Sequence, residues 1–330
     1  RMDRGVLEPG DGISLYQGGE KIGGFDLRPV DLKGEYVLAS PPFSSNEGEY
    51  AVYKTKDREF PAIMETISRI RLQEREAVRR PIELPSKRTR RGERESELSF
   101  YVSSLSVLEA VLPYADRVYY DGSKQEDEAL GMCDREGKEF VRVLPRLSLG
   151  EVEAEHDKVM VHTVDQYELN RDRELYGSYH MNFFNSHTIP RMHQCTLSPE
   201  LDREELLEVL SRTEERCEVM VFGRVELMLS RDPTLPEGTL IDDRGTRYPV
   251  HRDPEGFVHI SHSTDLLLLD KVPELRSMGV DSLGIDVRRR HPDMAAFVGR
   301  SFRELDIDDM GELRRKCGRS GLGHYRKGVF

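Results

Sequence analysis

The stretch LSFYVSSLSVLEAVLPYADRVYY, residues 98–120, contains a strand, a helix and a second strand in quick succession. Leu98–Val102 and Arg117–Tyr120 are short apolar runs of strand character, and Ser104–Leu112 has apolar residues at helical spacing behind a serine suited to an N-cap. So compact a succession is typical of one β/α repeat of a parallel sheet. We therefore expect the same unit to recur along the chain.

Further strand-like runs follow at Phe140–Leu144, Lys158–His162, Tyr179–Phe183, Cys195–Leu197, Glu218–Phe222 and Ser282–Val287. Helical segments separate most of them, among them Asp165–Arg173, Asp202–Arg212 and Pro292–Leu305. Eight strands alternating with helices predict an α/β fold of the (β/α)8, TIM-like barrel type. An open doubly wound sheet is the alternative, but no glycine-rich phosphate loop opens its first helix.

The interval between Phe222 and Ser282 is more than twice as long as the others. We predict a hairpin from Thr239–Ile241 to Arg247–Val250 with its turn at Asp242–Gly245, a strand at Gly256–Ser261 and a delayed helix at Asp265–Met278. An insertion after strand 7 of a barrel lies at its C-terminal mouth, where barrel enzymes keep their chemistry.

The chain before the barrel has two different patterns. Residues 1–60 contain short β-prone runs bounded by Gly, Pro, Ser and Asn, which predict a small, partial β-barrel-like domain. Residues 61–97 begin with isoleucines at helical spacing and continue into a polar run, which predicts a helical, basic linker. The predicted domains are thus 1–60, 61–97 and 98–330.

The 330-residue chain has a net charge of −12, which argues against a protein that coats nucleic acid over its whole surface. Charge is unevenly distributed, however, because ten basic and four acidic residues lie between Arg69 and Arg94. Such a stretch can hold a phosphate backbone or be a solvated linker. Arg88, Arg90 and Arg91 are its candidate RNA contacts.

Several classes of protein are not expected. No apolar run approaches the roughly 18 residues of a membrane span, and no leader-like pattern opens the chain, which starts at Arg1 as a fragment would. The four cysteines include no CxxC pair, so we expect reduced thiols, no metal centre and a cytoplasmic protein.

Polar residues just past the predicted strands should meet at the mouth of the barrel. They are Ser103, Asp121, Arg146, His162, Asn182, Asn185, Ser198, Glu200, Arg224, Glu226, Asp286 and Arg288. The candidates for substrate binding are Arg146, Asn182, Asn185, Arg224, Asp286 and Arg288. Arginine forks and amides suit a carboxylate or phosphate, although arginine–carboxylate pairs could equally tie the loops together.

The sequence offers candidates for catalytic residues but assigns none. Glu200 or Glu226 with His162 is the candidate water-activating pair of a hydrolase. His162, His180, His187 and His193 lie on different elements without HxxxH spacing, so we expect structural histidines and not a zinc site. No GxSxG elbow is present.

Several motifs resemble peptidase family U-32, the collagenase-like protease family. Asn182–Ser186 and Thr196–Leu201 resemble its barrel strands, and Glu218–Arg224 resembles its signature region. Asp242–Gly245, Tyr248-Pro249 and the closing Gly323–Val329 resemble later segments of the family. Gly10-Asp11-Gly12 and Ile22-Gly23-Gly24 resemble the small β domain that joins two barrels in long members.

This resemblance implies two activities. Family members are commonly described as proteases, whereas better-defined relatives take part in hydroxylating bases of tRNA or rRNA, with a 4Fe-4S cluster and prephenate implicated. The positions that match cluster cysteines are Glu226 and Pro233, and neither supplies a thiolate. We therefore expect no cofactor in this chain.

Three interpretations remain open. The first is a cluster-free accessory barrel, from the C-terminal portion of a long member, that binds RNA or a missing N-terminal catalytic barrel. The second is an active collagenase-like peptidase. The third is a barrel that binds a prephenate-like carboxylate through Arg146, Arg224 and Arg288.

Overall fold

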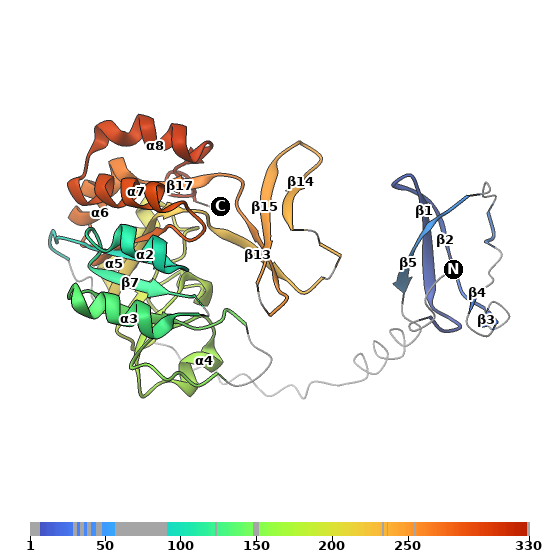
Figure 1. Ribbon diagram of the computed structural model, residues 1–330, viewed down its shortest axis with the longest axis horizontal. Helices are drawn as coiled ribbons and strands as arrows, with labels where there is room; N and C mark the ends of the chain where they lie inside the picture. The colour runs from blue at the N-terminus through green and yellow to red at the C-terminus, as the bar shows by residue number, and fades with distance from the viewer. Residues whose placement is uncertain are drawn as a thin grey trace, which may run out of the picture. The chain divides into compact units, whose positions relative to one another are not determined.

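The computed structural model describes residues 7–28, 32–33, 36–37, 41–43, 48–56, 91–122, 124–147, 152–232, 234–235, 237–253 and 255–328. The chain divides into two compact units, Arg1–Glu83 and Leu84–Phe330 (Figure 1). Most of the predicted linker, 61–97, lies outside the described residues.

The second unit contains a closed ring of eight parallel strands. In order around the ring these are β6 (Glu97–Val102), β7 (Arg117–Tyr120), β8 (Glu139–Val143), β9 (Lys158–Val161), β10 (Glu174–Gly177), β11 (Gln194–Thr196), β12 (Arg216–Gly223) and β18 (Ser282–Asp286). The pairing of β18 with β6 closes the ring, with Ser282 opposite Glu97 and Asp286 opposite Tyr101. The predicted TIM-like α/β barrel is confirmed.

Short helices connect the strands and cover the ring (Figure 1). They are α2 (Leu105–Val111), α3 (Glu126–Arg135), α4 (Val164–Leu169), α5 (Arg203–Arg212), α6 (Val272–Ser277), α7 (Pro292–Glu304) and α8 (Met310–Cys317), with 3-10 turns η2 (Tyr179–Met181), η3 (Leu269–Lys271) and η4 (Ile307–Asp309). In the described part of the chain, no helix has the length and apolar character needed to cross a membrane.

The fifth strand is shifted from its predicted position. Tyr179–Met181 is a 3-10 turn, and the strand is Glu174–Gly177. The Ser178 side chain accepts a hydrogen bond from the His180 N–H, and Asn182 ends the turn with a left-handed φ of 58°. Phe183 folds back onto Gly177, where a Cβ atom would lie 2.6 Å from its ring. The apolar residues after Gly177 therefore pack as a loop.

The delayed helix predicted at Asp265–Met278 is also shorter than expected. Asp265–Leu267 forms strand β17, antiparallel to β12, and only Val272–Ser277 is α-helical. The buried leucines after Asp265 pack against the ring where the chain comes back from the insertion. The proline in the first turn of α6 favours the start of the helix at that point. Strand β19 (Ser320–Gly321) pairs with β17.

The insertion itself is a four-stranded antiparallel sheet. Its strands are β13 (Glu226–Ser230), β16 (Val258–Ser261), β15 (Arg247–Arg252) and β14 (Gly238–Ile241), in that order. The predicted hairpin is confirmed, because Thr239 pairs with Pro249 and Ile241 with Arg247. Val250, Val258 and Ile260 form a small core of its own.

In the first unit, the described strands include an antiparallel sheet of β2 (Glu20–Asp26), β1 (Gly12–Gln17) and β5 (Ala51–Lys56). The short strands β3 (Leu32–Lys33) and β4 (Tyr36–Val37) pair with each other. Leu7, Ile13 and Leu27 are buried on one face of the three-stranded sheet, with Phe25 and Val52 packed against them.

A carboxylate is buried inside the barrel. Glu218, on β12, is fully buried and accepts hydrogen bonds from the Tyr101 hydroxyl at 2.7 Å and the Ser282 hydroxyl at 2.7 Å. Thr196 and Tyr119 donate at 3.1 Å, and Gln194 donates at 3.2 Å. Every lone-pair position of this carboxylate is thus occupied. Burial raises the pKa of both tyrosines, and the nearby Glu218 raises it further.

A buried arginine lies next to this carboxylate. Arg117, on β7, is bound to Glu139 at 2.6 Å and to Glu97 at 2.9 Å. Its remaining nitrogen donates to Ser99 and to Gln194, which connect it to the hydrogen bonds of Glu218. A polar network of this kind is stable only if each member is satisfied, so it fixes the mutual register of the strands.

We predict that Glu218→Ala lowers the free energy of unfolding by about 3–5 kcal/mol, because it removes the carboxylate that five buried donors share. Glu218→Gln, which keeps the shape and one acceptor oxygen, should lose less. Urea unfolding followed by circular dichroism measures both changes.

Glu136, exposed at the end of α3, provides the control, and Glu136→Ala should change stability by less than about 0.5 kcal/mol. Equal unfolding midpoints for Glu218→Ala and Glu136→Ala would contradict the role given to the buried carboxylate.

Candidate functional site at the barrel mouth

The carboxyl ends of the barrel strands bring five predicted site residues together. Asp121 follows β7, Arg146 follows β8, Asp286 ends β18 and Arg288 comes two residues later. Glu226 is the first residue of the inserted sheet. Because all ring strands are parallel, their C-terminal ends share one rim. The predicted mouth exists, and its chemistry depends on what these side chains contact.

Arg288 is held by two aspartates. Its guanidinium donates to both oxygens of Asp286, at 3.0 and 2.7 Å, and to Asp121 at 2.9 Å. Burial opposes the charge, but the two carboxylates outweigh it and raise the pKa of Arg288 well above its usual value. The Tyr101 ring lies 5.6 Å from the guanidinium carbon. Arg288 therefore joins the ends of β7 and β18.

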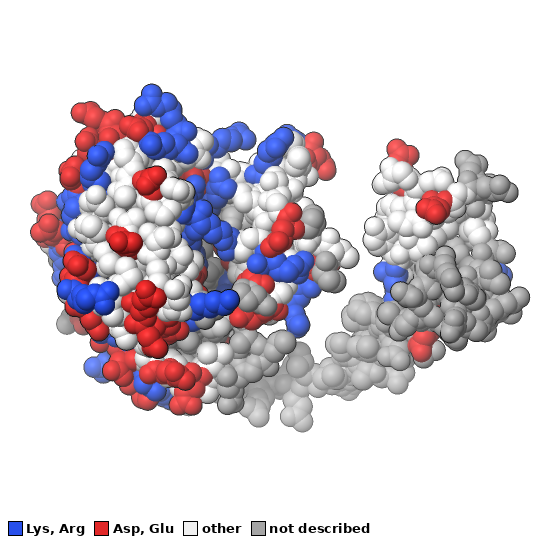
Figure 2. Space-filling model, in the orientation of Figure 1, with Lys and Arg blue, Asp and Glu red and all other residues white. Residues whose placement is uncertain are grey.

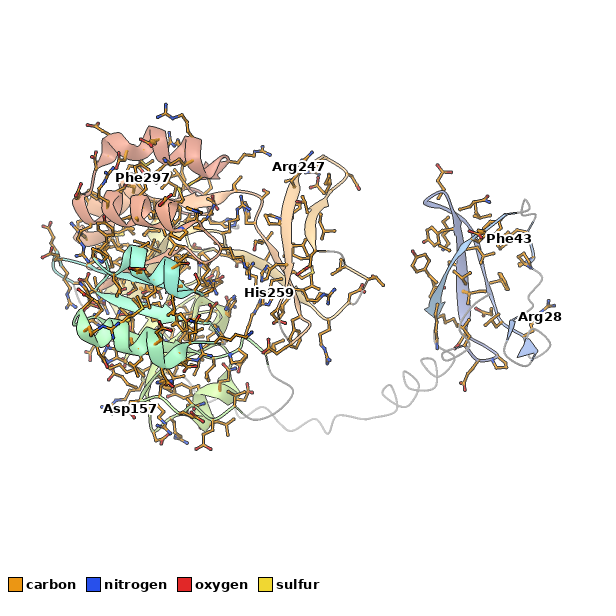
Figure 3. The ribbon with its side chains drawn as sticks, in the orientation of Figure 1. Arg28, Phe43, Asp157, Arg247, His259 and Phe297 are labelled. Atoms are coloured by element: carbon orange, nitrogen blue, oxygen red, sulfur yellow. The ribbon has the colours of Figure 1, made fainter. Side chains whose placement is uncertain are left out.

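Arg146 and Glu226 form a second ion pair that joins the barrel to the inserted sheet. Glu226 also contacts Nδ1 of His259 at 2.5 Å, and Nε2 of His259 contacts Asp253 at 3.1 Å. Figure 3 shows His259 on the inserted sheet, at its side toward the barrel. This series of contacts continues into the barrel, because His180 Nε2 lies 3.6 Å from Glu226.

His162 is buried beneath this series of contacts. Its Nδ1 lies 2.7 Å from the Ser178 hydroxyl and its Nε2 lies 3.0 Å from the Leu144 carbonyl oxygen. Nδ1 of His180 is 3.2 Å from Nδ1 of His162. Both nitrogens of His162 thus have protein partners, so neither is open to a water molecule that it could activate.

Burial governs the protonation of these histidines. Burial lowers the pKa of His162 to about 3, and the charge of Arg288 acts in the same direction. Burial also lowers the pKa of His180 well below its usual value and that of His251 to about 3. For His259, burial lowers the pKa and the carboxylate of Asp253 opposes the shift. His162, His180 and His251 are accordingly neutral near pH 7.

The remaining predicted residues do not join the central group. Asn182 and Glu200 are exposed. Asn185 closes its own turn by accepting from the backbone N–H groups of His187 and Thr188. Arg224 donates to the buried Asp265, at 3.0 Å, and so connects β12 to β17. Glu200 and His162 therefore do not form a pair, and Glu226 is separated from His162 by His180.

Sequence reasoning did not identify His251, His259 and Asp253 as part of the mouth. His251 and His259 are direct cross-strand partners on β15 and β16, with their rings stacked at 4.4 Å. Arg289 contacts His251 from the barrel side. The predicted pairing of these two strands could have placed the histidines side by side, but nothing in the sequence indicates which face of the sheet meets the barrel.

One group elsewhere has metal-ligand atoms close together. Oxygens of Glu139 and Glu174 and a nitrogen of His193 lie within 4.8 Å of one another at the opposite end of the barrel. Lys158 and the Tyr176 hydroxyl already bind these carboxylates, at 2.6 Å to Glu139 in both cases. We therefore interpret the group as an ion-pair network.

Neither residue that the resemblance places at the cluster positions, Glu226 and Pro233, supplies a thiolate. Glu226 is committed to Arg146 and His259, and Pro233 lies outside the described residues. All four thiols are buried, Cys133 in α3 and Cys317 in α8. Cys195 and Cys217 lie 3.7 Å apart on neighbouring strands.

The predicted RNA contacts are only partly described. Arg91 is 5% exposed; it binds Asp281 at 2.5 Å and the backbone oxygens of Gly279, Thr213 and Glu215. Its guanidinium therefore connects the segments that precede β12 and β18 and is not exposed to a ligand. Arg88 and Arg90 lie outside the described residues.

We predict that acid destabilises the barrel. Because the folded-state pKa of His162 lies far below the usual 6.5, the unfolded chain binds a proton that the folded chain excludes. This contribution is complete above pH 6.5 and is lost as pH falls toward 3, by about 2 kcal/mol at pH 5. Urea unfolding at pH 7 and pH 5 measures it.

His162→Gln should weaken this pH dependence, whereas the exposed His187→Gln should leave it intact. An identical loss of stability at pH 5 in wild type and His162→Gln would show that the buried imidazole is not responsible.

Comparison with known proteins finds a partial match to a curated protein and distant structural likenesses. No family model matches the chain. Over 146 residues it is 24% identical to tRNA hydroxylation protein P2 of Bacillus subtilis (strain 168), a match that covers 37% of this chain and 47% of that protein. The chain thus matches about half the length of this relative. The spore cortex-lytic enzyme SleL of Bacillus cereus, a solved structure, aligns over 60% of this chain and 71% of its own with 9% identity and a TM-score of 0.32.

Proposed function

We propose that this chain is an accessory barrel of a U32-type protein connected with hydroxylation of RNA bases, and that it binds RNA without carrying out the reaction. The observation that carries this proposal is the similarity to a protein named for tRNA hydroxylation. The TIM-like barrel and the order of the family-like motifs agree with it.

The accessory role is supported at the mouth because two of its arginines are paired with carboxylates of the chain itself. Arg288 binds Asp286 and Asp121, and Arg146 binds Glu226. A carboxylate or phosphate ligand would have to displace these carboxylates before it could form a bidentate contact. A prephenate-like ligand held by the three predicted arginines is therefore less favoured, since Arg224 is also paired, with Asp265.

The peptidase interpretation finds less support in the same geometry. A carboxylate that activates water must be free to accept a proton, but Glu226 is bound by an arginine and a histidine. Glu200 is exposed, and the structure gives it no histidine partner among the described residues.

RNA binding requires a basic surface outside the mouth. Figure 2 shows acidic and basic side chains interspersed over the visible face of the barrel, with no face of a single sign there. The sequence concentrates its positive charge between Arg69 and Arg94 instead. Because the Arg91 side chain is buried and bound within the barrel, we assign the phosphate contacts to the preceding residues. Arg88 and Arg90 are the first of these to test.

We predict that the chain binds unmodified tRNA with an affinity that falls steeply between 50 and 200 mM salt. The double variant Arg88→Ala/Arg90→Ala should bind more weakly and lower the slope of log K against log salt by up to about 2, roughly one unit for each lost phosphate contact. Fluorescence anisotropy with labelled tRNA measures both quantities.

Arg135→Ala/Arg171→Ala removes the same charge from two exposed positions on the barrel and should leave affinity nearly unchanged. Equal losses in the two double variants would assign the effect to net charge alone. Absence of salt-dependent binding by the wild type would refute RNA binding and favour the partner-domain role.

A further inference from the structure

We infer that a hollow on the small β sheet of the first unit binds one base of single-stranded RNA. The hollow has a volume of about 570 Å³ and is lined by Tyr16, Gln17, Gly18, Gly19, Glu49, Ala51 and Tyr53. This inference rests on the proposed RNA-binding function and names where, and in what form, the RNA is contacted.

Two tyrosines give the hollow its aromatic wall. Tyr16 and Tyr53 lie on neighbouring strands with ring centroids 5.2 Å apart and planes at 82°. In this edge-to-face arrangement one ring supports the other. Tyr53 is 53% exposed, although a ring of its size is ordinarily covered when it serves only the core. Because Tyr16 already fixes the exposed Tyr53 ring, a base can stack on that ring with little cost in conformational entropy of the protein.

The sheet directs this wall away from its own core. Val52, next to Tyr53 on β5, packs with Ile13 and Leu27 on the buried face. Because successive side chains of a strand point to opposite faces, Tyr53 projects from the other face. The Tyr53 ring therefore lies outside the buried core of the unit, and its removal should leave the sheet folded.

The turn beside the tyrosines keeps the hollow open. Gly18 and Gly19 connect β1 to β2 with φ values of 61° and 89°, a two-glycine hairpin turn. A Cβ atom at either position would meet nothing within 4 Å, so the space over the turn is empty. A planar ring can thus approach the backbone at this side without a steric barrier.

Polar groups at the rim suit the edge of a base. Gln17 offers an amide donor and acceptor, and Glu49 a carboxylate that can accept from base amino or imino groups. Lys21, the exposed cross-strand partner of Tyr16, supplies a positive charge next to the aromatic wall. An aromatic platform with hydrogen-bonding side chains and a nearby cation matches a single-stranded nucleotide better than a paired one, whose base edges are occupied.

The test uses the full chain and an unstructured 12-residue oligoribonucleotide that contains 2-aminopurine. Stacking on Tyr53 should quench the fluorescence of 2-aminopurine on binding, and the same sequence in a duplex should bind more weakly without quenching. Tyr53→Ala should weaken binding about tenfold and abolish the quenching, whereas Tyr53→Phe, which keeps the ring, should stay within twofold of wild type. Lys21→Glu should also weaken binding.

The outcomes separate the two proposals. If the wild type binds the oligonucleotide but Tyr53→Ala binds and quenches equally well, the hollow is not the site and RNA binding elsewhere stands. If the wild type binds neither this oligonucleotide nor tRNA, the proposed function fails and the hollow fails with it. Circular dichroism of each variant checks that the chain is folded.

Discussion

The barrel depends on one buried carboxylate, that of Glu218, which five donors from four other strands surround. A buried carboxylate is tolerated only when its hydrogen bonds are complete, so the strands must adopt the register that brings these donors together. Gly284 belongs to the same constraint, because a Cβ there would lie 3.0 Å from the Glu218 carboxylate. The interior is consequently filled with ordered polar side chains and is not a channel.

Charged side chains at the mouth of the barrel are likewise paired with groups of the chain itself. Where barrel enzymes leave charged groups open to a substrate, this chain binds Arg288 to Asp286 and Arg146 to Glu226. The inserted sheet adds His259, which is bound on both ring nitrogens. These contacts join the barrel to the insertion, in agreement with the proposal that RNA is bound elsewhere on the chain.

Much of the fold could be predicted from the sequence, because alternating apolar runs and helices repeat regularly from Leu98 onward. The predicted strand positions were wrong where contacts of the flanking residues outweighed the local sequence pattern. Tyr179–Met181 has strand-like residues, yet Ser178 and Asn182 cap a 3-10 turn there. Five of the predicted mouth residues lie together, since parallel strands end at one rim, whereas Asn182, Asn185, Glu200 and Arg224 do not join them. Their partners could not be predicted from the sequence. His259 contacts Glu226, and Asp265 accepts from Arg224, only because the insertion folds back onto the barrel. Arg91 shows the same limit, since a basic run does not reveal which arginine is buried.

We propose that RNA contacts the first unit and the basic stretch, and that the mouth of the barrel takes no part. Ultraviolet cross-linking of the full chain to tRNA, followed by mass spectrometry of the linked peptides, tests it most directly. Linked peptides are expected from the region before the barrel, including the one that contains Tyr53. Linked peptides that contain Arg146, His180 or Arg288 would contradict it and place the nucleic acid at the mouth.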